Sequence, residues 1–366
     1  MPHLFFLAAG GTGGHLFPAY ALAQELNRRG HTVDLVTDDR GDRYGSDFPA
    51  RQTHRIPAAT FRGVSLASIK GALKLLRGVH ASRKLIAREK PAAVIGFGGY
   101  PTFPPLVAAR MRGLPRAIHE ANAVMGRANR ALAPHVTAVA TSFANTGLLG
   151  KTDPSRVRVT GNPVRDNVRS LAKRPYVSSA ADQSFQLVVF GGSQGARYFS
   201  DTVPPAVARL APELRSRLSI TQQCREEDMS RVSAAYQAQG VTAHLGTFFK
   251  DLPQRMSDAQ LVIARAGASS VTELAVLGRP SLLVPLPHAL DNDQLRNASA
   301  LAAAGGAWCL EQAQLDAEVL AAHLHKAMTS PRNLAMAAAA AAGEGRADAV
   351  ERLADLAERL ASGADG

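Results

Sequence analysis

Cysteine and tryptophan are scarce in this chain of 366 residues, which contains two of the first and one of the second. The two cysteines, Cys224 and Cys309, are too few for a disulfide framework, and we expect a reducing compartment. The chain has no HExxH and no CxxC sequence, so we expect no metal site and no cofactor. No apolar run reaches the ~18 residues of a membrane-spanning helix, and we expect a protein that does not cross a membrane.

Acidic residues are outnumbered, and the excess of positive charge is concentrated in one segment. The formal net charge is +12, and residues 51–90 contain ten lysines and arginines but a single acid, Glu89. Within 63–90, apolar residues recur at helical spacing between the basic ones, as in an amphipathic helix that meets anionic lipid. A helix that packs on its own domain and leaves a solvated basic face is the alternative. No nucleic-acid-binding motif is present, and we expect no nucleic acid as a partner.

The distribution of apolar runs predicts two α/β domains. The predicted strands are 3–9, 32–37, 92–97, 116–120, 136–141, 185–190, 217–222, 242–248, 259–265 and 280–286, with helical patterns between them. Alternating strands and helices over this length indicate a doubly wound, mostly parallel sheet in each half of the chain. The segment 159–168 is the predicted crossover between the halves. The alanine-rich tail from about 331 is predicted to be helical.

Glycine-rich loops follow several of these predicted strands. "GGTGGH" (10–15) lies between a strand and a helix that has Pro18 near its start, and "GGSQG" (191–195) repeats this arrangement. A third loop, "GFGG" (96–99), also follows a strand. Bare backbone in front of a helix N-terminus favours the binding of an anion such as a phosphate group. His15 stands where the third glycine of GxGxxG would be, which argues against an NAD-dependent dehydrogenase, the alternative function.

Polar side chains gather at two further predicted strand ends. His119, Glu120 and Asn122 follow one strand, and Glu273 lies in the helix that begins in "GASSVTE" (267–273). A carboxylate at that place can bind two sugar hydroxyls, or it can simply interact with the helix dipole. The polar residues of 288–294 follow the next strand and suit a ligand with many hydroxyl groups.

Several motifs occur in one order along nearly the whole chain: "GGTGGHLFPA", "GFGGYPTFPP", "HEAN", "GNPVR", "GGSQGAR", "RAGASSVTE", "GRPSLLVPLP" and "DNDQ". This order resembles the MurG family, the UDP-N-acetylglucosamine:N-acetylmuramyl-(pentapeptide) pyrophosphoryl-undecaprenol N-acetylglucosamine transferases of peptidoglycan synthesis. The resemblance implies the GT-B fold, with two Rossmann-like domains that face each other across a cleft. Residues 1–162 would bind the acceptor and the membrane, residues 163–342 would bind the UDP-sugar, and a helix at 343–366 would pack back on the first domain.

The activity that this resemblance implies is an inverting hexosyl transfer. N-acetylglucosamine would pass from UDP-N-acetylglucosamine to the 4-hydroxyl of lipid-linked N-acetylmuramyl-pentapeptide (lipid I to lipid II). A transferase of the same fold that acts on another lipid acceptor, such as diacylglycerol, is the alternative. The protein would be peripheral, on the cytoplasmic face of the bacterial cell membrane. The residues expected to meet the anionic membrane surface are Lys70, Leu73, Lys74, Leu76 and Arg77.

Roles for individual residues follow from the matching motifs. Thr12, Gly13 and Gly14 would line the first phosphate loop, and Asn122, Arg165 and Ser193 would face the nucleotide sugar. The backbone of Phe249 would meet uracil, and Ala268, Ser269, Ser270, Val271, Thr272 and Glu273 would hold the diphosphate and the ribose. Gln294 would reach the sugar, with Asp293 as the neighbouring alternative. Ala121 departs from the family, which usually has Gln there.

The implied chemistry needs a base near the acceptor hydroxyl and stabilisation of the departing UDP. His15 is the first candidate for the base, because histidine ordinarily titrates near the working pH, and Glu120 is the second. Backbone amides around Ser193 and Gly195, together with Arg165, would take the charge of the leaving group in place of a metal ion. Closure of the two domains would need a hinge near 161–167.

Overall fold

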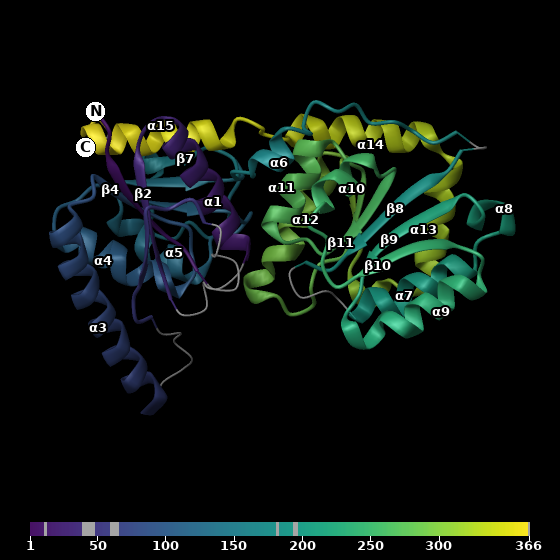
Figure 1. The fold of residues 1–366 in the computed structure, drawn as a ribbon, viewed down its shortest axis with the longest axis horizontal. Coiled ribbons are helices and arrows are strands. Elements are labelled where there is room, and N and C mark those ends of the chain that lie inside the picture. Colours follow the sequence, from purple (N-terminus) through teal and green to yellow (C-terminus); the bar gives the residue numbers. More distant parts are fainter. Residues whose placement is uncertain (11–12, 39–47, 59–65, 181–182, 193–196, 365–366) are drawn as a thin grey trace. The chain divides into compact units, whose positions relative to one another are not determined.

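The computed structural model describes residues 1–10, 13–38, 48–58, 66–180, 183–192 and 197–364, without the side chains of 66–70. The chain forms two compact units (Figure 1). Unit 1 is Met1–Arg165 with Ala347–Gly366, and unit 2 is Asp166–Arg346. The boundaries between the units, at 165/166 and 346/347, lie a few residues after the domain boundaries expected at 162/163 and 342/343. Each unit contains a parallel sheet covered by helices, which confirms the predicted pair of Rossmann-like domains.

Unit 1 has a seven-stranded sheet with a hydrophobic core on each of its two faces. Its order is β3 (Gln52–Arg55), β2 (Thr32–Thr37), β1 (Leu4–Ala8), β4 (Ala93–Gly96), β5 (Arg116–Glu120), β6 (Ala138–Thr141) and β7 (Val157–Val159). Neighbouring residues of a strand point to opposite faces. Phe5 and Leu7 therefore pack with α1 (Gly13–Arg28) and α15 (Ala349–Ser362). Phe6 and Ala8 pack on the other face with α3 (Leu66–Glu89), α4 (Phe103–Met111) and α5 (Arg127–Leu132).

The C-terminal helix α15 packs on unit 1, against α1. Leu353, Leu356 and Leu360 are buried in the same cluster as the α1 side chains. Burial of one leucine side chain contributes about 1.5–3 kcal/mol. At the end of α1, the Nη1 atom of Arg29 donates to Asp355 and Glu358, at 2.7 Å in each case. Apolar contacts and ion pairs thus hold the end of the chain on its first domain.

Unit 2 has a six-stranded parallel sheet. Its order is β10 (Thr242–Gly246), β9 (Leu218–Gln223), β8 (Phe185–Phe190), β11 (Leu261–Ala264), β12 (Ser281–Leu283) and β13 (Ala307–Cys309). One core cluster joins Leu187 and Val189 to α7 (Arg197–Ala208), α9 (Met229–Ala238) and α13 (Ala317–Thr329). The remaining helices are α6 (Asp166–Arg169), α8 (Pro212–Arg215), α10 (Leu252–Asp258), α11 (Ala268–Leu277), α12 (Asp293–Ala303) and α14 (Pro331–Glu344).

Every predicted strand is present. Three short strands, β3, β7 and β13, were not predicted, and the start of one helix differs from the prediction. β3 is polar and exposed at the edge of its sheet, where it pairs with β2 through the backbone. β7 and β13 have three residues each, too few to show a period. The prediction that Pro18 lies near the start of its helix is wrong, because α1 already includes Gly13 and contains Pro18 in its interior. There, proline removes only one backbone hydrogen bond of a long, well-packed helix.

Candidate active site

The motifs found in the sequence lie at the carboxyl ends of the central strands. The order of the strands reverses between β1 and β4 in unit 1, and between β8 and β11 in unit 2. Ligands of doubly wound sheets bind at such switch points, outside the carboxyl ends of the strands. The described loops at these points include 9–10 and 97–99 in unit 1, and 191–192 and 265–267 in unit 2. Each unit therefore carries a candidate ligand site of its own.

The imidazole of His15 lies against two glycines of another motif. Its Nδ1 atom is 3.3 Å from the carbonyl oxygen of Gly10. Since a carbonyl only accepts, the neutral ring carries its proton on Nδ1 and its lone pair on Nε2. Gly98 and Gly99 have φ angles of +91° and +75°, and a Cβ atom on Gly98 would come within 3.2 Å of the imidazole. Only glycine suits both this backbone and this approach, so two glycine motifs meet at His15.

His119 is a second imidazole near His15, and it is fully buried. Its Nε2–H donates to the carbonyl oxygen of Gly161 at 3.1 Å, and its Nδ1 atom has no hydrogen-bond partner within the described residues. Burial, with a smaller contribution from a charge on His15, lowers the pKa of His119 to about 4, although the hydrogen bond to Gly161 acts in the opposite direction. His119 is therefore neutral near pH 7.

The carboxylate of Glu120 is held by four donors and is only 3% exposed. Its Oε1 accepts from the backbone N–H and the side-chain amide of Asn122, at 2.9 and 3.1 Å. Its Oε2 accepts from the N–H of Gly126 at 3.0 Å and from Nδ2 of Asn129 at 2.8 Å. These four hydrogen bonds hold the carboxylate in place and fix the loop that follows β5.

Arg165, at the end of unit 1, lies beside the first turns of α1. Its guanidinium carbon is 4.1 Å from the centre of the Phe17 ring, in a cation–π contact. Phe17 also approaches Gly13, where a Cβ atom would come within 3.1 Å of its ring. Unit 1 thus gathers parts of the motifs that contain Gly13, His15 and Arg165.

In unit 2, the candidate site is built on the start of α11. Gly267 is the N-cap of this helix, and no side chain among the described residues caps its first amides. Ala268, Val271 and Glu273 are buried, whereas Ser269, Ser270 and Thr272 are partly exposed. The buried hydroxyl oxygen of Ser269 has no hydrogen-bond partner within the described residues. Uncapped amides and a hydroxyl at a helix N-terminus are suited to an anion.

Other residues of unit 2 that are expected to bind the UDP-sugar already have contacts inside the protein. The Oε1 atom of Gln294 accepts from the N–H of Leu286 at 3.0 Å, and Asp293 accepts from the N–H of Gln294 at 2.7 Å. The guanidinium of Arg255 lies 4.8 Å from the ring centre of Phe249. Gly192, with φ of +84°, follows β8, and the N–H of Gly191 donates to Gln223 at 3.1 Å.

Some expected residues lie outside the described part of the chain, and the structure adds others. Thr12, Ser193 and Gly195 are not among the described residues, and neither is the side chain of Lys70. Asn129 and Gly161 were not singled out individually from the sequence, although they hold Glu120 and His119. Asn129 belongs to a polar stretch in which no spacing marks it. Gly161 belongs to "GNPVR", but its partner lies 42 positions earlier in the chain.

Across the described ranges, His, Cys, Asp and Glu side chains form no group of three or more that could hold a metal ion. None of the described helices is long and apolar enough to cross a bilayer.

Comparison with known proteins defines the class. The profile of the glycosyltransferase family 28 N-terminal domain matches residues 5–141, and that of its C-terminal domain matches 186–353. With two Rossmann-like domains and sites at both switch points, the chain has the architecture of a GT-B glycosyltransferase.

Individual relatives show to which family of glycosyltransferases the chain belongs. Proteins of Chelativorans sp. and Mesorhizobium japonicum are 54% and 52% identical to this chain over 361 and 362 residues, which is 98% of the chain in both cases and 95% and 96% of those relatives. Both are named UDP-N-acetylglucosamine--N-acetylmuramyl-(pentapeptide) pyrophosphoryl-undecaprenol N-acetylglucosamine transferase. The crystal structure of Acinetobacter baumannii MurG aligns with a TM-score of 0.80 at 30% identity, over 98% of this chain and 100% of that one. The chain belongs to the MurG family, and the resemblance of the motifs is confirmed.

Proposed function

We propose that this protein transfers N-acetylglucosamine from UDP-N-acetylglucosamine to the 4-hydroxyl of lipid-linked N-acetylmuramyl-pentapeptide, with inversion at the anomeric carbon. The observation that carries this proposal is the 54% identity, over 98% of the chain, to a relative named for this transfer. The test is incubation with labelled UDP-N-acetylglucosamine and a short-chain analogue of the lipid-linked acceptor. Formation of the disaccharide is expected. Transfer to diacylglycerol, with none to the muramyl acceptor, would contradict the proposal.

His15 is the base in this proposal. The contact between its Nδ1 atom and the carbonyl oxygen of Gly10 orients the imidazole, and histidine is the side chain most often used for proton transfer in catalysis. The neighbouring His119 is kept neutral by burial, so no second positive charge stands beside the ring when His15 takes up a proton. Glu120 is less suited to this role, because both of its carboxylate oxygens already accept hydrogen bonds from the protein.

Substitution separates these two candidates. His15→Ala should reduce turnover by about 10²–10⁴, the usual contribution of a general base, while the affinity for the donor stays unchanged. His31→Ala is the matched control, since His31 is a histidine of unit 1 that interacts with Glu358 of α15. A decrease of less than about tenfold in His15→Ala would make His15 a positioning residue and Glu120 the first candidate.

The donor is proposed to bind in unit 2, with Glu273 accepting ribose hydroxyls. The burial of Glu273 supports this assignment, as do the hydroxyl of Ser269 and the first amides of α11, which have no side-chain partner among the described residues. Glu273→Ala should strongly raise the KM for the nucleotide sugar and leave the melting temperature nearly unchanged. Glu318→Ala, which removes an exposed acid from the start of α13, is the control. Loss of folding without an effect on donor KM would return Glu273 to a structural role.

The departing diphosphate is proposed to be stabilised by helix amides and by Arg165. Amides at the start of α11 carry partial positive charge toward an anion. Arg165 is the last residue of unit 1, inside the expected hinge 161–167.

The first half of α3 is proposed to bind the cytoplasmic face of the membrane. Leu73 and Leu76 are 50% and 66% exposed, whereas Leu85 and Ile86, near the end of the same helix, are buried. The exposed leucines are interleaved with exposed cations, Lys74 and Arg77 among them. Such a face combines apolar insertion with attraction to anionic headgroups, about 1 kcal/mol for each cation.

Vesicle binding tests this docking surface. Lys70, Lys74 and Arg77 replaced together by Glu should weaken binding to vesicles that contain phosphatidylglycerol, and added salt should weaken the binding of the unmodified protein. Activity on a water-soluble acceptor should persist in the same variant. A control variant carries Glu at three exposed cations of unit 2: Arg209, Lys326 and Arg332. Equal vesicle binding by both variants would mean that the membrane meets another surface.

A further inference from the structure

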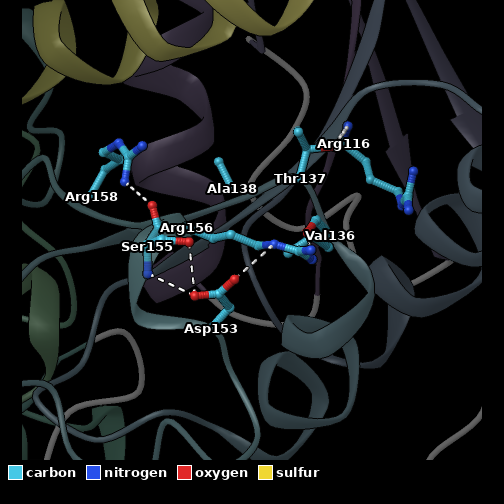
Figure 2. A pocket seen from close by; sticks show the side chains of 8 residues that line it. All are labelled: Arg116, Val136, Thr137, Ala138, Asp153, Ser155, Arg156 and Arg158. Carbon is cyan, nitrogen blue, oxygen red and sulfur yellow. Dashed lines mark hydrogen bonds and ion pairs between the residues drawn. The ribbon is translucent and has the colours of Figure 1, made fainter. Parts of the chain in front are cut away.

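A cavity of about 460 Å³ lies in unit 1, at the amino ends of β5, β6 and β7 (Figure 2). Its polar lining consists of Arg116, Thr137, Asp153, Ser155, Arg156 and Arg158. Because these strands are parallel, this edge of the sheet is opposite to the one that carries Glu120. The volume falls within the range of about 300–1,000 Å³ that is common for small-molecule sites. The proposed glycosyl transfer makes no use of this cavity.

Each of the three guanidinium groups donates to backbone carbonyls. Arg116 donates through Nε to the carbonyl of His135 at 2.6 Å and through Nη1 to that of Leu114 at 2.9 Å. Arg156 donates through Nη1 to the carbonyl of Val136 at 3.2 Å. A carbonyl oxygen orients a guanidinium but does not neutralise its charge. The cations are therefore positioned and remain positive.

The single acid of the cavity is largely engaged in its own turn. Asp153 accepts from the N–H of Ser155 at 2.9 Å and from its hydroxyl at 2.8 Å, and caps the short helix Pro154–Arg156. Its other oxygen is 3.7 Å from Nε of Arg156. Figure 2 shows Arg156 extended between Asp153 and Val136, with Arg158 on the side of Ser155. The lining thus contains three cations and one carboxylate, and that carboxylate is already hydrogen-bonded.

The positive charges also destabilise one another. Burial, followed by the charges of Arg110 and Arg156, lowers the pKa of Arg116. Arg158 donates to the carbonyls of Ser155 and Val157, and neither it nor Arg116 forms an ion pair within the described residues. An anion placed among these groups would relieve the repulsion and accept charge-assisted hydrogen bonds.

We propose that this cavity binds an anion that carries one or two phosphate groups, held by Arg116, Arg156 and Arg158. Arginine suits this ligand because its planar fork of N–H donors matches the oxygens of a phosphate group. The phosphate belongs either to a small soluble molecule or to a lipid headgroup. In both cases this second site lies on the opposite edge of the sheet from His15 and works independently of glycosyl transfer.

The test uses the full chain and inorganic pyrophosphate as the probe. Titration calorimetry at low salt gives the affinity, and hydrogen–deuterium exchange of residues 133–159 locates the binding. Exchange of residues 266–273 reports separately on pyrophosphate at the proposed donor site. Arg156→Gln with Arg158→Gln should weaken binding at the cavity by about tenfold or more for each cation removed. Arg209→Gln with Arg332→Gln, which removes the same charge from the surface of unit 2, should leave it unchanged.

A parallel experiment replaces pyrophosphate by vesicles, either of phosphatidylcholine alone or with phosphatidylglycerol. Protection of 133–159 by pyrophosphate identifies a soluble phosphate ligand. Protection by the anionic vesicles alone, lost in the Arg156/Arg158 variant, identifies a lipid headgroup. No protection by either probe, or equal binding by the cavity variant and its control, would overturn the proposal.

Discussion

Unit 1 should lose stability as the pH falls below 7, because His119 resists protonation in the folded chain. Burial and the neighbouring His15 bring the pKa of His119 to about 4, compared with its ordinary value of 6.5. Between these values the unfolded chain binds the proton and the folded chain does not. The stability of unit 1 is therefore complete above pH 6.5, falls as the pH is lowered, and reaches its lower limit below pH 4.

The two pKa values set the size of this effect. Their difference corresponds to about 3 kcal/mol of unfolding free energy, since each pKa unit is worth about 1.4 kcal/mol. About 2 kcal/mol of this amount is lost between pH 7 and pH 5, where the unfolded histidine becomes almost fully protonated. That is a large fraction of the ~5–15 kcal/mol that stabilises a typical domain.

Amide hydrogen exchange in β5 measures the free energy of opening at the place where His119 lies. His119→Gln removes the titration and keeps an N–H donor for the carbonyl of Gly161. Between pH 7 and pH 5, the unmodified protein should lose about 2 kcal/mol more than this variant. His323→Gln is the matched control, since burial also lowers the pKa of His323 but this residue belongs to α13 of unit 2.

The test compares how steeply the free energy of opening changes with pH in each protein. It therefore remains valid even if His119→Gln changes the absolute stability. Equal pH dependence in the unmodified protein and in His119→Gln would mean that His119 titrates in the folded chain as it does in the unfolded one. The argument from burial would then be refuted. An altered slope in His323→Gln would show that opening of β5 reports on unit 2 as well.

Three further predictions concern packing, acid and metal ions. Gly96→Ala should destabilise unit 1 by about 1–3 kcal/mol in urea unfolding, because its Cβ would lie 2.1 Å from Cγ2 of Thr102. Gly343→Ala, where a Cβ meets nothing within 4 Å, should not destabilise, and an equal loss in both variants would contradict the packing argument. Burial raises the pKa of Asp34, but hydrogen bonds led by that of Arg51 bring it below its ordinary value, so this carboxylate stabilises the fold above pH 4 and less as acid protonates it. Asp34→Asn should flatten the acid limb of the stability curve, and an unchanged limb would refute this. Transfer activity should survive exhaustive chelation, because in the proposed mechanism helix amides and Arg165 take the charge of the diphosphate, and loss restored by magnesium would contradict this mechanism.

Local patterns explain why most of the fold could be predicted. Runs such as "LFFLA" and "LVVF" are buried on both faces of a parallel sheet, so nearly every residue in them is apolar. β3, with the sequence "QTHR", has no such run, because an edge strand needs only backbone partners. The helix around Pro18 was misplaced because proline is common in a first turn, whereas tertiary packing holds it in the interior of α1.

The motifs that form the candidate site could be predicted from the sequence, but the contacts between them could not. "GGTGGH" and "GFGG" each indicate a loop at a strand end, and the family resemblance points to His15. That Gly98 packs against the His15 ring depends on the pairing of β1 with β4, which joins segments far apart in the chain. The four donors around Glu120 depend in the same way on the fold of the loop after β5. A polar residue in a sequence does not show whether its partner is a substrate or its own backbone.

The hydrogen bond between His119 and Gly161 joins the site to the end of unit 1. Gly161 has a φ of +85°, and its carbonyl accepts from His119 and also from the hydroxyl of Thr160 at 3.0 Å. The chain that leaves this glycine reaches Arg165, which lies over the ring of Phe17 in α1. In the proposed reaction, one neutral imidazole therefore has two effects. It fixes the segment that presents the arginine, and it keeps a second positive charge away from His15 while that residue takes the proton of the acceptor.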